Sequence, residues 1–126
     1  MKRDMELIKK ILLALEANNT INQYLHYSNL NLEGYDDNEV AYHVKLAHEA
    51  GLIELAGNKP VQTIGSPPIY FIQCLTWEGH EFLDASRSPK VWNSALKIIK
   101  DKGLGISFDV LKALLSAYAL HEVGLK

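Results

Sequence analysis

The chain has 126 residues, of which 48% are hydrophobic, and a formal net charge of -2. This length suits a single domain with a real core, and the apolar content excludes a chain that is disordered throughout. The near-neutral charge provides no overall basic field of the kind that usually accompanies nucleic-acid binding.

A first helix is predicted over residues 4–17, where apolar side chains recur at helical spacing behind Asp4. The periodicity is lost over residues 20–35, in which β-favouring residues surround a break at Ser28 and Asn29. We therefore expect a short extended segment there with at most one helical turn, rather than a full second helix.

The chain is organised around a helix that is predicted over residues 36–50. Asp36 or Asp37 can cap its N-terminus, and Gly51 supplies a left-handed stop before a strand expected at residues 52–56. A capped helix with a glycine stop and an immediate strand is typical of the recognition helix of a winged helix-turn-helix. The apolar stripe of this helix consists of Val40, Val44 and Ala47.

A β-hairpin wing is expected after this helix. The strand at residues 52–56 is followed by a loop over residues 57–68, which holds two glycines and three prolines, and by a strand rich in β-formers over residues 69–75. Lys59 is the one charged residue expected at the tip of the wing.

Two capped helices are predicted after the wing. Thr76 can cap a helix whose Trp77 and Phe82 are expected to pack back on the wing. Ser88–Pro89 starts the next helix, because proline is tolerated in the first turn.

A last helix is predicted behind Ser107, and it has almost no polar face. We expect it to be sandwiched inside the domain or to pair with another chain. The chain is thus predicted to be an α+β protein with one domain over residues 1–126. A winged helix-turn-helix core with a β-hairpin wing occupies residues 1–86, and two additional C-terminal helices form an extension over residues 87–126. The alanines that remove the polar face of the last helix are Ala113, Ala117 and Ala119.

Six segments along nearly the whole chain share the sequence pattern of one known family. They are Met1–Met5, Glu39–Leu46, Glu49–Glu54, Leu75–Ala85, Val91–Asn93 and Ser107–Leu111. These segments resemble the small bacterial and phage proteins of the domain of unknown function family number 2513. The resemblance implies a winged-helix-like fold and an origin in bacteria or prophages, and it carries over no catalytic residues. Ala47–His48 departs from the family pattern, in which a larger apolar residue often follows Leu46.

The charges are distributed unevenly along the chain. Four cations against three anions give residues 1–17 a balance of +1, whereas two cations against nine anions give residues 18–86 a balance of -7. Seven cations against three anions give residues 87–126 a balance of +4. The predicted recognition helix therefore lies in the acidic part of the chain.

DNA binding by a winged helix needs lysines and arginines against the phosphates. Asn38 or Lys45 could contact base edges, but Asp37 and Glu39 would repel nearby phosphates. The possible recognition surface consists of Asn38, Ala41, Tyr42, Lys45 and His48, with Lys59 on the wing.

A basic face is expected on the penultimate helix. This face is either a solvated run of lysines or the contact for an acidic partner, which could be phosphate or the acidic centre of a second copy. Its residues are Lys90, Lys97, Lys100 and Lys102.

Catalytic and metal-binding motifs are not evident. Cys74 is the single cysteine, so no disulfide within the chain and no thiolate zinc framework can form, and a buried thiol is the default. His43 and His48 point about 140° apart on one helix, so they are poor joint metal ligands. We expect the five histidines to be surface or partly buried residues. His80 and Glu81 stand together in one turn, but a structural role explains them.

The sequence therefore predicts a non-catalytic, cytoplasmic binding protein without metal or cofactor. No apolar run approaches the roughly 20 residues of a membrane span, and no secretory signal is found. Protein contacts are the first expectation, either with another copy through the last helix or with a host or phage protein. Several tyrosines before and within the recognition helix could anchor such an interface. The alternative is a DNA-binding transcriptional regulator whose Tyr42, Lys45 and Lys59 touch the duplex.

Overall fold

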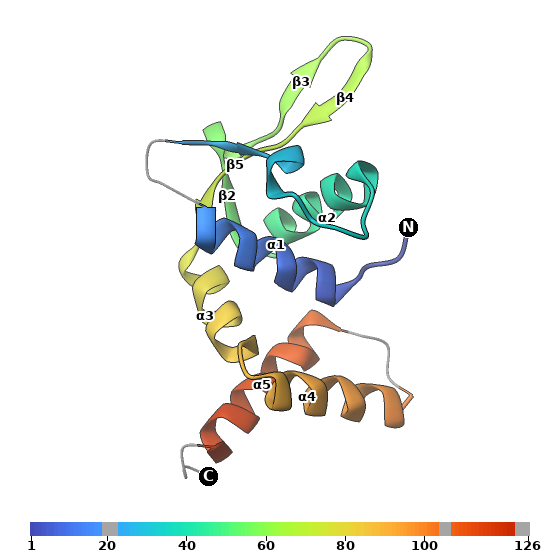
Figure 1. Ribbon diagram of the computed structural model, residues 1–126, viewed down its shortest axis with the longest axis vertical. Helices are drawn as coiled ribbons and strands as arrows, with labels where there is room; N and C mark the ends of the chain where they lie inside the picture. Colours follow the sequence, from blue (N-terminus) through green and yellow to red (C-terminus); the bar gives the residue numbers. More distant parts are fainter. Residues whose placement is uncertain (19–22, 104–106, 123–126) are drawn as a thin grey trace. The chain divides into compact units, whose positions relative to one another are not determined.

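The computed structural model describes residues 1–18, 23–103 and 107–122 (Figure 1). It has the predicted α+β composition, with α-helices, short 3-10 helices (η) and antiparallel strands. The elements in chain order are α1 (Met5–Asn18), β1 (Leu25–His26), η1 (Tyr27–Leu30), α2 (Asp37–Glu49), β2 (Ile53–Leu55), η2 (Ala56–Asn58), β3 (Val61–Thr63), β4 (Ser66–Ile69), β5 (Phe71–Leu75), α3 (Trp77–Ser86), α4 (Pro89–Asp101) and α5 (Phe108–Glu122).

The chain forms two compact units. Unit 1 comprises residues 1–80 and unit 2 comprises residues 81–126. The division falls within α3, so that this helix contributes residues to both units. The boundary predicted from the sequence, at residue 86, lies at the end of the same helix.

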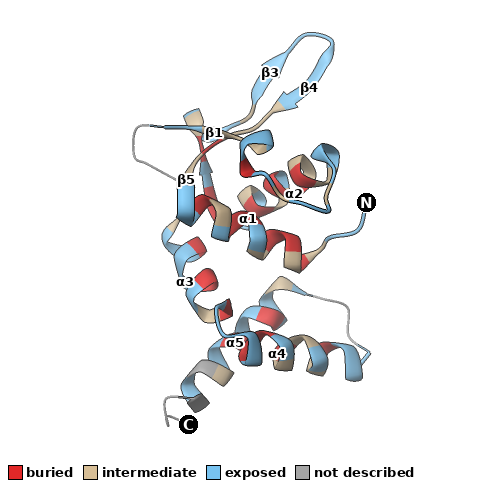
Figure 2. Ribbon diagram, in the orientation of Figure 1, coloured by how far each residue is buried: buried red, intermediate tan, exposed pale blue. Residues whose placement is uncertain are grey.

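Unit 1 is built on a three-stranded antiparallel sheet with the strand order β1-β5-β2. Leu25 lies opposite Ile72, and Ile53 lies opposite Leu75. α1 contacts α2 and β5, while α2 contacts β2, so the core lies between the two helices and the sheet. Figure 2 shows the buried side of α1 facing this core. The fully buried side chains include Leu7, Ile11, Leu12, Leu15, Val44, Leu52, Leu55 and Ile72.

The helices of unit 1 confirm the sequence prediction. α1 and α2 lie within one residue of their predicted bounds, and the carboxylate of Asp36 accepts a hydrogen bond from the Glu39 N–H at 2.8 Å. Gly51 has a φ of 77°, as a left-handed stop requires. β1 and η1 form the expected short strand and single turn, while residues 20–22 of that predicted segment lie outside the described residues.

The predicted loop of the wing is wrong, because most of it is a second antiparallel pair. β3 and β4 pair around a turn at Ile64–Gly65, in which Gly65 has a φ of 76°. Prolines disfavour a central strand but are allowed in a strand with a free edge, as β4 is. Lys59 precedes β3 and is therefore not at the tip of the wing, which corrects its predicted position.

The predicted packing of Trp77 and Phe82 on the wing is also wrong. The Trp77 side chain is 77% exposed, whereas Phe82 is buried in unit 2 against the rings of Trp92 and Phe108. Trp77 and Phe82 are five positions apart on one helix, which places their side chains about 140° apart. The two side chains therefore cannot face the same surface.

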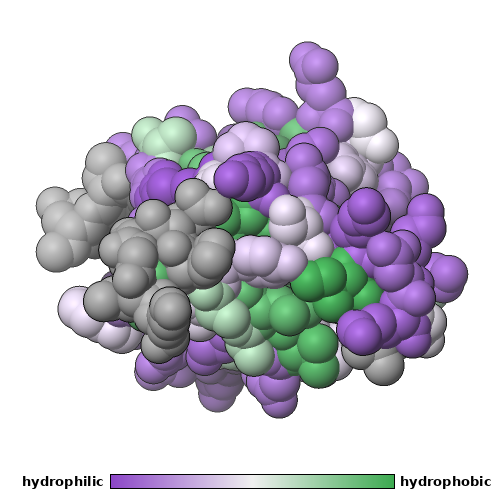
Figure 3. All heavy atoms as spheres, turned by 90° about the horizontal axis from the view of Figure 1, so that it is seen from below, coloured by the Kyte–Doolittle hydropathy of each residue, from purple (hydrophilic) through white to green (hydrophobic). Residues whose placement is uncertain are grey.

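Unit 2 pairs α4 with α5. Ser88 caps α4, with its hydroxyl accepting from the Val91 N–H at 3.3 Å, and Pro89 occupies the first turn as predicted. Leu111 and Leu115 of α5 are fully buried, whereas the opposite side of α5 is an exposed apolar stripe. Figure 3 shows one face of the molecule on which apolar residues (green) gather beside polar ones (purple). The described residues of the stripe are Val110, Ala113, Ala117 and Leu120, and the side chain of Ala119 lies outside the described part.

Candidate recognition surface

The candidate recognition surface is the side of α2 that turns away from the core of unit 1. Asn38 and Lys45 are exposed, and Ala41, Tyr42 and His48 are half-buried. The spacing of these residues places them on one side of the helix, because positions three, four and seven apart fall within the same stripe. The opposite stripe, with Val40, Val44 and Ala47, is buried as predicted.

Tyr42, Lys45 and Glu49 form a small cluster on this surface. The Lys45 Nζ lies 5.7 Å from the centroid of the Tyr42 ring and 3.8 Å from the Glu49 Oε2. The side chains of the ion pair are 45% and 56% exposed, so the pair contributes little to stability. The single lysine of α2 therefore already has an anionic neighbour.

The N-terminal end of α2 is acidic. Asp37 is exposed and Glu39 is half-buried, and the carboxylate of Asp36 caps the helix. Negative side chains stabilise this end, where the helix dipole is positive. They also give the candidate recognition surface a negative potential along its first turn.

Lys59, which the sequence placed with this surface, belongs to a different element. It is exposed between η2 and β3, and it lines a hollow of about 470 Å³ in unit 1. The hollow is formed by one continuous stretch of chain. The residues around it are Ala56, Gly57, Lys59, Pro60, Val61 and Gln62.

His43 is a structural residue that the sequence prediction missed. It is fully buried, which contradicts the expectation of a surface or partly buried histidine. Its Nδ1 lies 2.8 Å from the Glu39 carbonyl oxygen, and its Nε2 accepts from the Asp4 N–H at 2.8 Å. Because a carbonyl oxygen only accepts, Nδ1 carries the proton in this arrangement. His43 lies between Val40 and Val44 on the apolar stripe, and that spacing was the signal for its burial.

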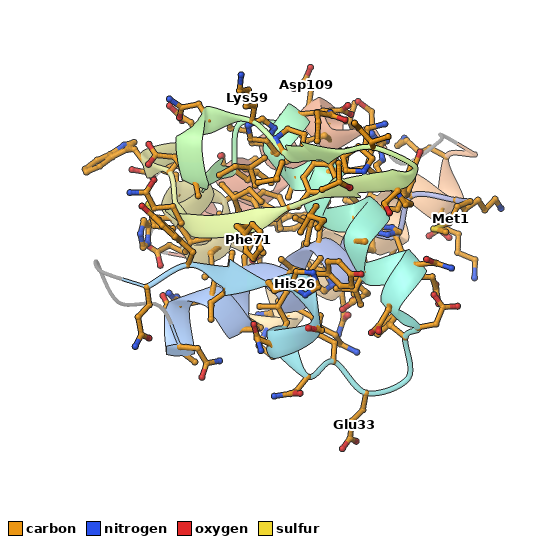
Figure 4. The ribbon with its side chains drawn as sticks, turned by 90° about the horizontal axis from the view of Figure 1, so that it is seen from above. Met1, His26, Glu33, Lys59, Phe71 and Asp109 are labelled. Atoms are coloured by element: carbon orange, nitrogen blue, oxygen red, sulfur yellow. The ribbon has the colours of Figure 1, made fainter. Side chains whose placement is uncertain are left out.

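Aromatic side chains of unit 1 gather around β1 and η1. The His26 ring lies 4.0 Å from the Tyr27 ring and 5.7 Å from the Phe71 ring, measured between centroids, and Figure 4 shows His26 beside Phe71. Tyr24 is 58% exposed, and the Lys10 Nζ lies 5.2 Å from the centroid of the Tyr35 ring. The tyrosines that could anchor an interface thus include one that is largely open to solvent.

Cys74 is held as a neutral thiol. Its Sγ donates a hydrogen bond to the Glu54 Oε2 at 3.4 Å. Burial raises the pKa of this thiol, and the hydrogen bond and negative charge of Glu54 raise it further. A nucleophilic cysteine needs the opposite shift, so this environment disfavours thiolate chemistry.

The described residues offer no cluster of three or more histidine, cysteine or carboxylate side chains that could hold a metal ion. In that same part of the chain, no helix has the length and apolar character that crossing a membrane requires. The residues of the predicted basic face lie in unit 2, three of them in α4 and Lys102 just after it. The four lysines, Lys90, Lys97, Lys100 and Lys102, are all exposed.

Comparisons with known proteins agree with the resemblance seen in the sequence. A family model described as "Hypothetical protein (DUF2513)" matches residues 2–105. An "Uncharacterized protein" of Haemophilus influenzae is 38% identical over 112 residues, which cover 89% of this chain and 90% of that protein. No solved structure matches the chain significantly.

Proposed function

The chain belongs to the DUF2513 family of hypothetical proteins, and on this premise we propose that it is a non-catalytic winged-helix protein that binds another protein through α2. The partner surface that fits is a basic one, because complementary charge steers and orients a protein contact. Tyr42 supplies an aromatic anchor on the same surface.

The order of elements in unit 1 supports the winged-helix part of this proposal. The chain passes through α1, β1, η1 and α2 before it forms β2, the β3–β4 ribbon and β5. In the sheet, β5 lies between β1 and β2. In a winged helix the return strand occupies this central position. η1 stands where the second helix of a helix-turn-helix would be, and its four residues shorten that element to one turn.

The observation that carries the choice of a protein partner is the charge of α2. Residues 36–49 contain four acidic side chains and one lysine, and that lysine lies 3.8 Å from Glu49. Phosphate contacts supply most of the affinity of a DNA-binding domain. A helix with this charge would lose that contribution and would be attracted to a basic protein surface instead.

A pull-down from a bacterial lysate, followed by affinity measurement on the captured protein, tests the proposal. Asp37→Lys reverses an exposed charge at the acidic end of α2, and Glu78→Lys makes the same change on α3. We expect a partner whose affinity falls at least tenfold with Asp37→Lys or Tyr42→Ala and stays unchanged with Glu78→Lys. Equal affinities for Asp37→Lys and Glu78→Lys would exclude α2 as the binding surface.

A DNA-binding regulator is the second candidate, favoured by the exposed Lys45 and the half-buried Tyr42 on the helix that would enter the major groove. Fluorescence anisotropy with a random-sequence duplex at several salt concentrations distinguishes the two. We expect no salt-dependent binding at micromolar protein. Binding that weakens steeply with salt and is lost in Lys45→Glu or Lys59→Glu would establish the regulator instead.

A further inference from the structure

The β3–β4 ribbon is an uncovered part of unit 1. All residues of β3 and the first three of β4 are exposed, and the two strands form a sheet of their own (Figure 1). Val61 is 43% exposed, and Ile64 at the turn is 105% exposed. An isolated two-stranded hairpin is at best marginally stable in water, so a ribbon with exposed apolar side chains calls for a covering surface.

The two free edges of the ribbon differ. Consecutive residues of a strand point their N–H groups alternately to either side, and β4 holds the consecutive prolines Pro67 and Pro68. The proline whose nitrogen points to the free edge has no N–H to donate there. The free edge of β4 therefore cannot pair fully with another strand. β3 contains no proline and no charge, so its edge is open.

The ribbon is also suited by its charge to face a copy of itself. Residues 60–77 contain no charged side chain. A two-fold contact places the same patch of both molecules together, and like charges in that patch would repel. The acidic side of α2 and the lysines of α4 would meet this repulsion, whereas the ribbon would not.

We propose that two copies of the chain pair through their β3 edges, antiparallel, about a two-fold axis at Gln62. The result is a four-stranded sheet in the order β4-β3-β3-β4. In this register Val61 lies opposite Thr63 of the second copy, and Ile64 lies opposite Pro60. The two copies of Lys59 are six residues apart along the paired strands, which is about 20 Å at roughly 3.4 Å per residue. This separation exceeds the Debye length at physiological salt, so the repulsion between the two lysines is screened.

The hollow beside β3 agrees with this register. Pro60 lines it, together with Val61 and Gln62, and its volume is about 470 Å³. The pairing brings Ile64 of the second copy against Pro60, and thus to this hollow. The most exposed apolar side chain of the ribbon would therefore lie beside a residue that lines the hollow, once from each copy.

Sedimentation velocity on the full chain tests the pairing. We expect a concentration-dependent dimer, which Gln62→Lys weakens at least tenfold because it places two lysines together on the axis. Ser66→Lys adds the same charge to β4 and should leave the dimer constant within about twofold. Circular dichroism and thermal unfolding of both variants verify the fold. A wild-type monomer at high micromolar concentration, or equal weakening by both variants, overturns the proposal.

Disulfide trapping tests the register directly. Residues directly opposite each other in an antiparallel pair have Cα atoms about 4.5–5.5 Å apart, which a disulfide can span. In a Cys74→Ser background we expect Gln62→Cys to form a covalent dimer on oxidation and Ser66→Cys to remain monomeric. Equal trapping at both positions, or none at Gln62→Cys, overturns the register. The pairing does not involve α2, so its failure leaves the proposed protein partner of α2 unaffected.

Discussion

His43 shows how one buried polar side chain links two helices of unit 1. Its ring joins the Glu39 carbonyl of α2 to the Asp4 N–H, and the Asp4 carboxylate in turn accepts from the Glu6 N–H at 2.9 Å and the Leu7 N–H at 3.3 Å. The imidazole thus holds the capped start of α1 against α2. A neutral ring with the proton on Nδ1 satisfies both partners.

Replacing His43 by leucine is expected to destabilise the protein by about 1–3 kcal/mol, because the N–H of the half-buried Asp4 loses its acceptor. His48→Leu is the matched control, since His48 is half-buried on the same helix, and it should change stability by no more than about 0.5 kcal/mol. Urea unfolding of the two variants measures the difference. Equal losses of stability in the two variants would mean that the hydrogen bonds of His43 do not stabilise the protein.

Cys74 should react slowly with iodoacetamide near neutral pH. Burial and Glu54 raise the pKa of the thiol, and a raised pKa means less thiolate at any given pH. Glu54→Gln removes the negative charge, so the pH of half-maximal alkylation should fall. The fall is expected to be partial, because burial is the largest cause of the shift and remains. Glu49→Gln serves as the control, and an unchanged pH profile in Glu54→Gln would contradict this role of Glu54.

At the scale of elements, the start of α3 is fixed by close packing on the segment after α2. The Thr76 N–H donates to the Leu52 carbonyl at 3.0 Å, and the Thr76 hydroxyl accepts from the Gly79 N–H at 2.9 Å. Gly79 has no room for a side chain, since a Cβ there would lie 2.0 Å from the Leu52 oxygen. The glycine permits the close approach of helix and backbone.

Gly79→Ala is therefore expected to destabilise unit 1 by about 1–3 kcal/mol, the usual range for overpacking. The sign of this change in stability is informative, because alanine in a helix otherwise stabilises a protein by roughly 0.5–1 kcal/mol relative to glycine. Glu78→Ala, at the neighbouring exposed position, should be neutral or slightly stabilising. Denaturant unfolding compares the two variants, and a stabilised Gly79→Ala would show that the backbones have space to separate.

Local signals explain why the helices could be predicted from the sequence. Asp36, Thr76 and Ser88 each accept a hydrogen bond from an N–H in the first turn of the helix that follows. A cap and the residues it serves are neighbours in sequence, so the pattern is visible without the fold. The bounds of α1 and α2 and the start of α4 were accordingly close to those observed.

The remaining features depended on contacts that are distant in sequence. The Asp4 N–H, which donates a hydrogen bond to His43, is 39 residues away. β3 and β4 have three and four residues, and the prolines of β4 indicated a loop rather than a strand. For the candidate surface, the sequence identified the exposed side of α2, but it grouped Lys59 with that side although Lys59 lies in the approach to β3.

At the scale of the whole molecule, the two units carry opposite net charge. Unit 1 has six lysine and arginine residues against ten acidic residues, whereas unit 2 has seven against five. The lysines at positions 90, 97, 100 and 102 are exposed in unit 2, and the acids of α2 lie in unit 1. A molecule with this distribution should bind a polyanion through α4 and not through the helix that would read DNA.

Chromatography on heparin, a sulfated polyanion, tests this distribution with two single substitutions. Lys97→Glu and Lys45→Glu each change the charge by two units at an exposed position on a helix. We expect Lys97→Glu to elute at clearly lower salt than the wild type, because it interrupts the lysine face. Lys45→Glu should elute with the wild type, since Glu49 already offsets Lys45 at 3.8 Å. An equal or larger shift in elution for Lys45→Glu would place the anion-binding surface on α2. That result would support DNA binding by this helix.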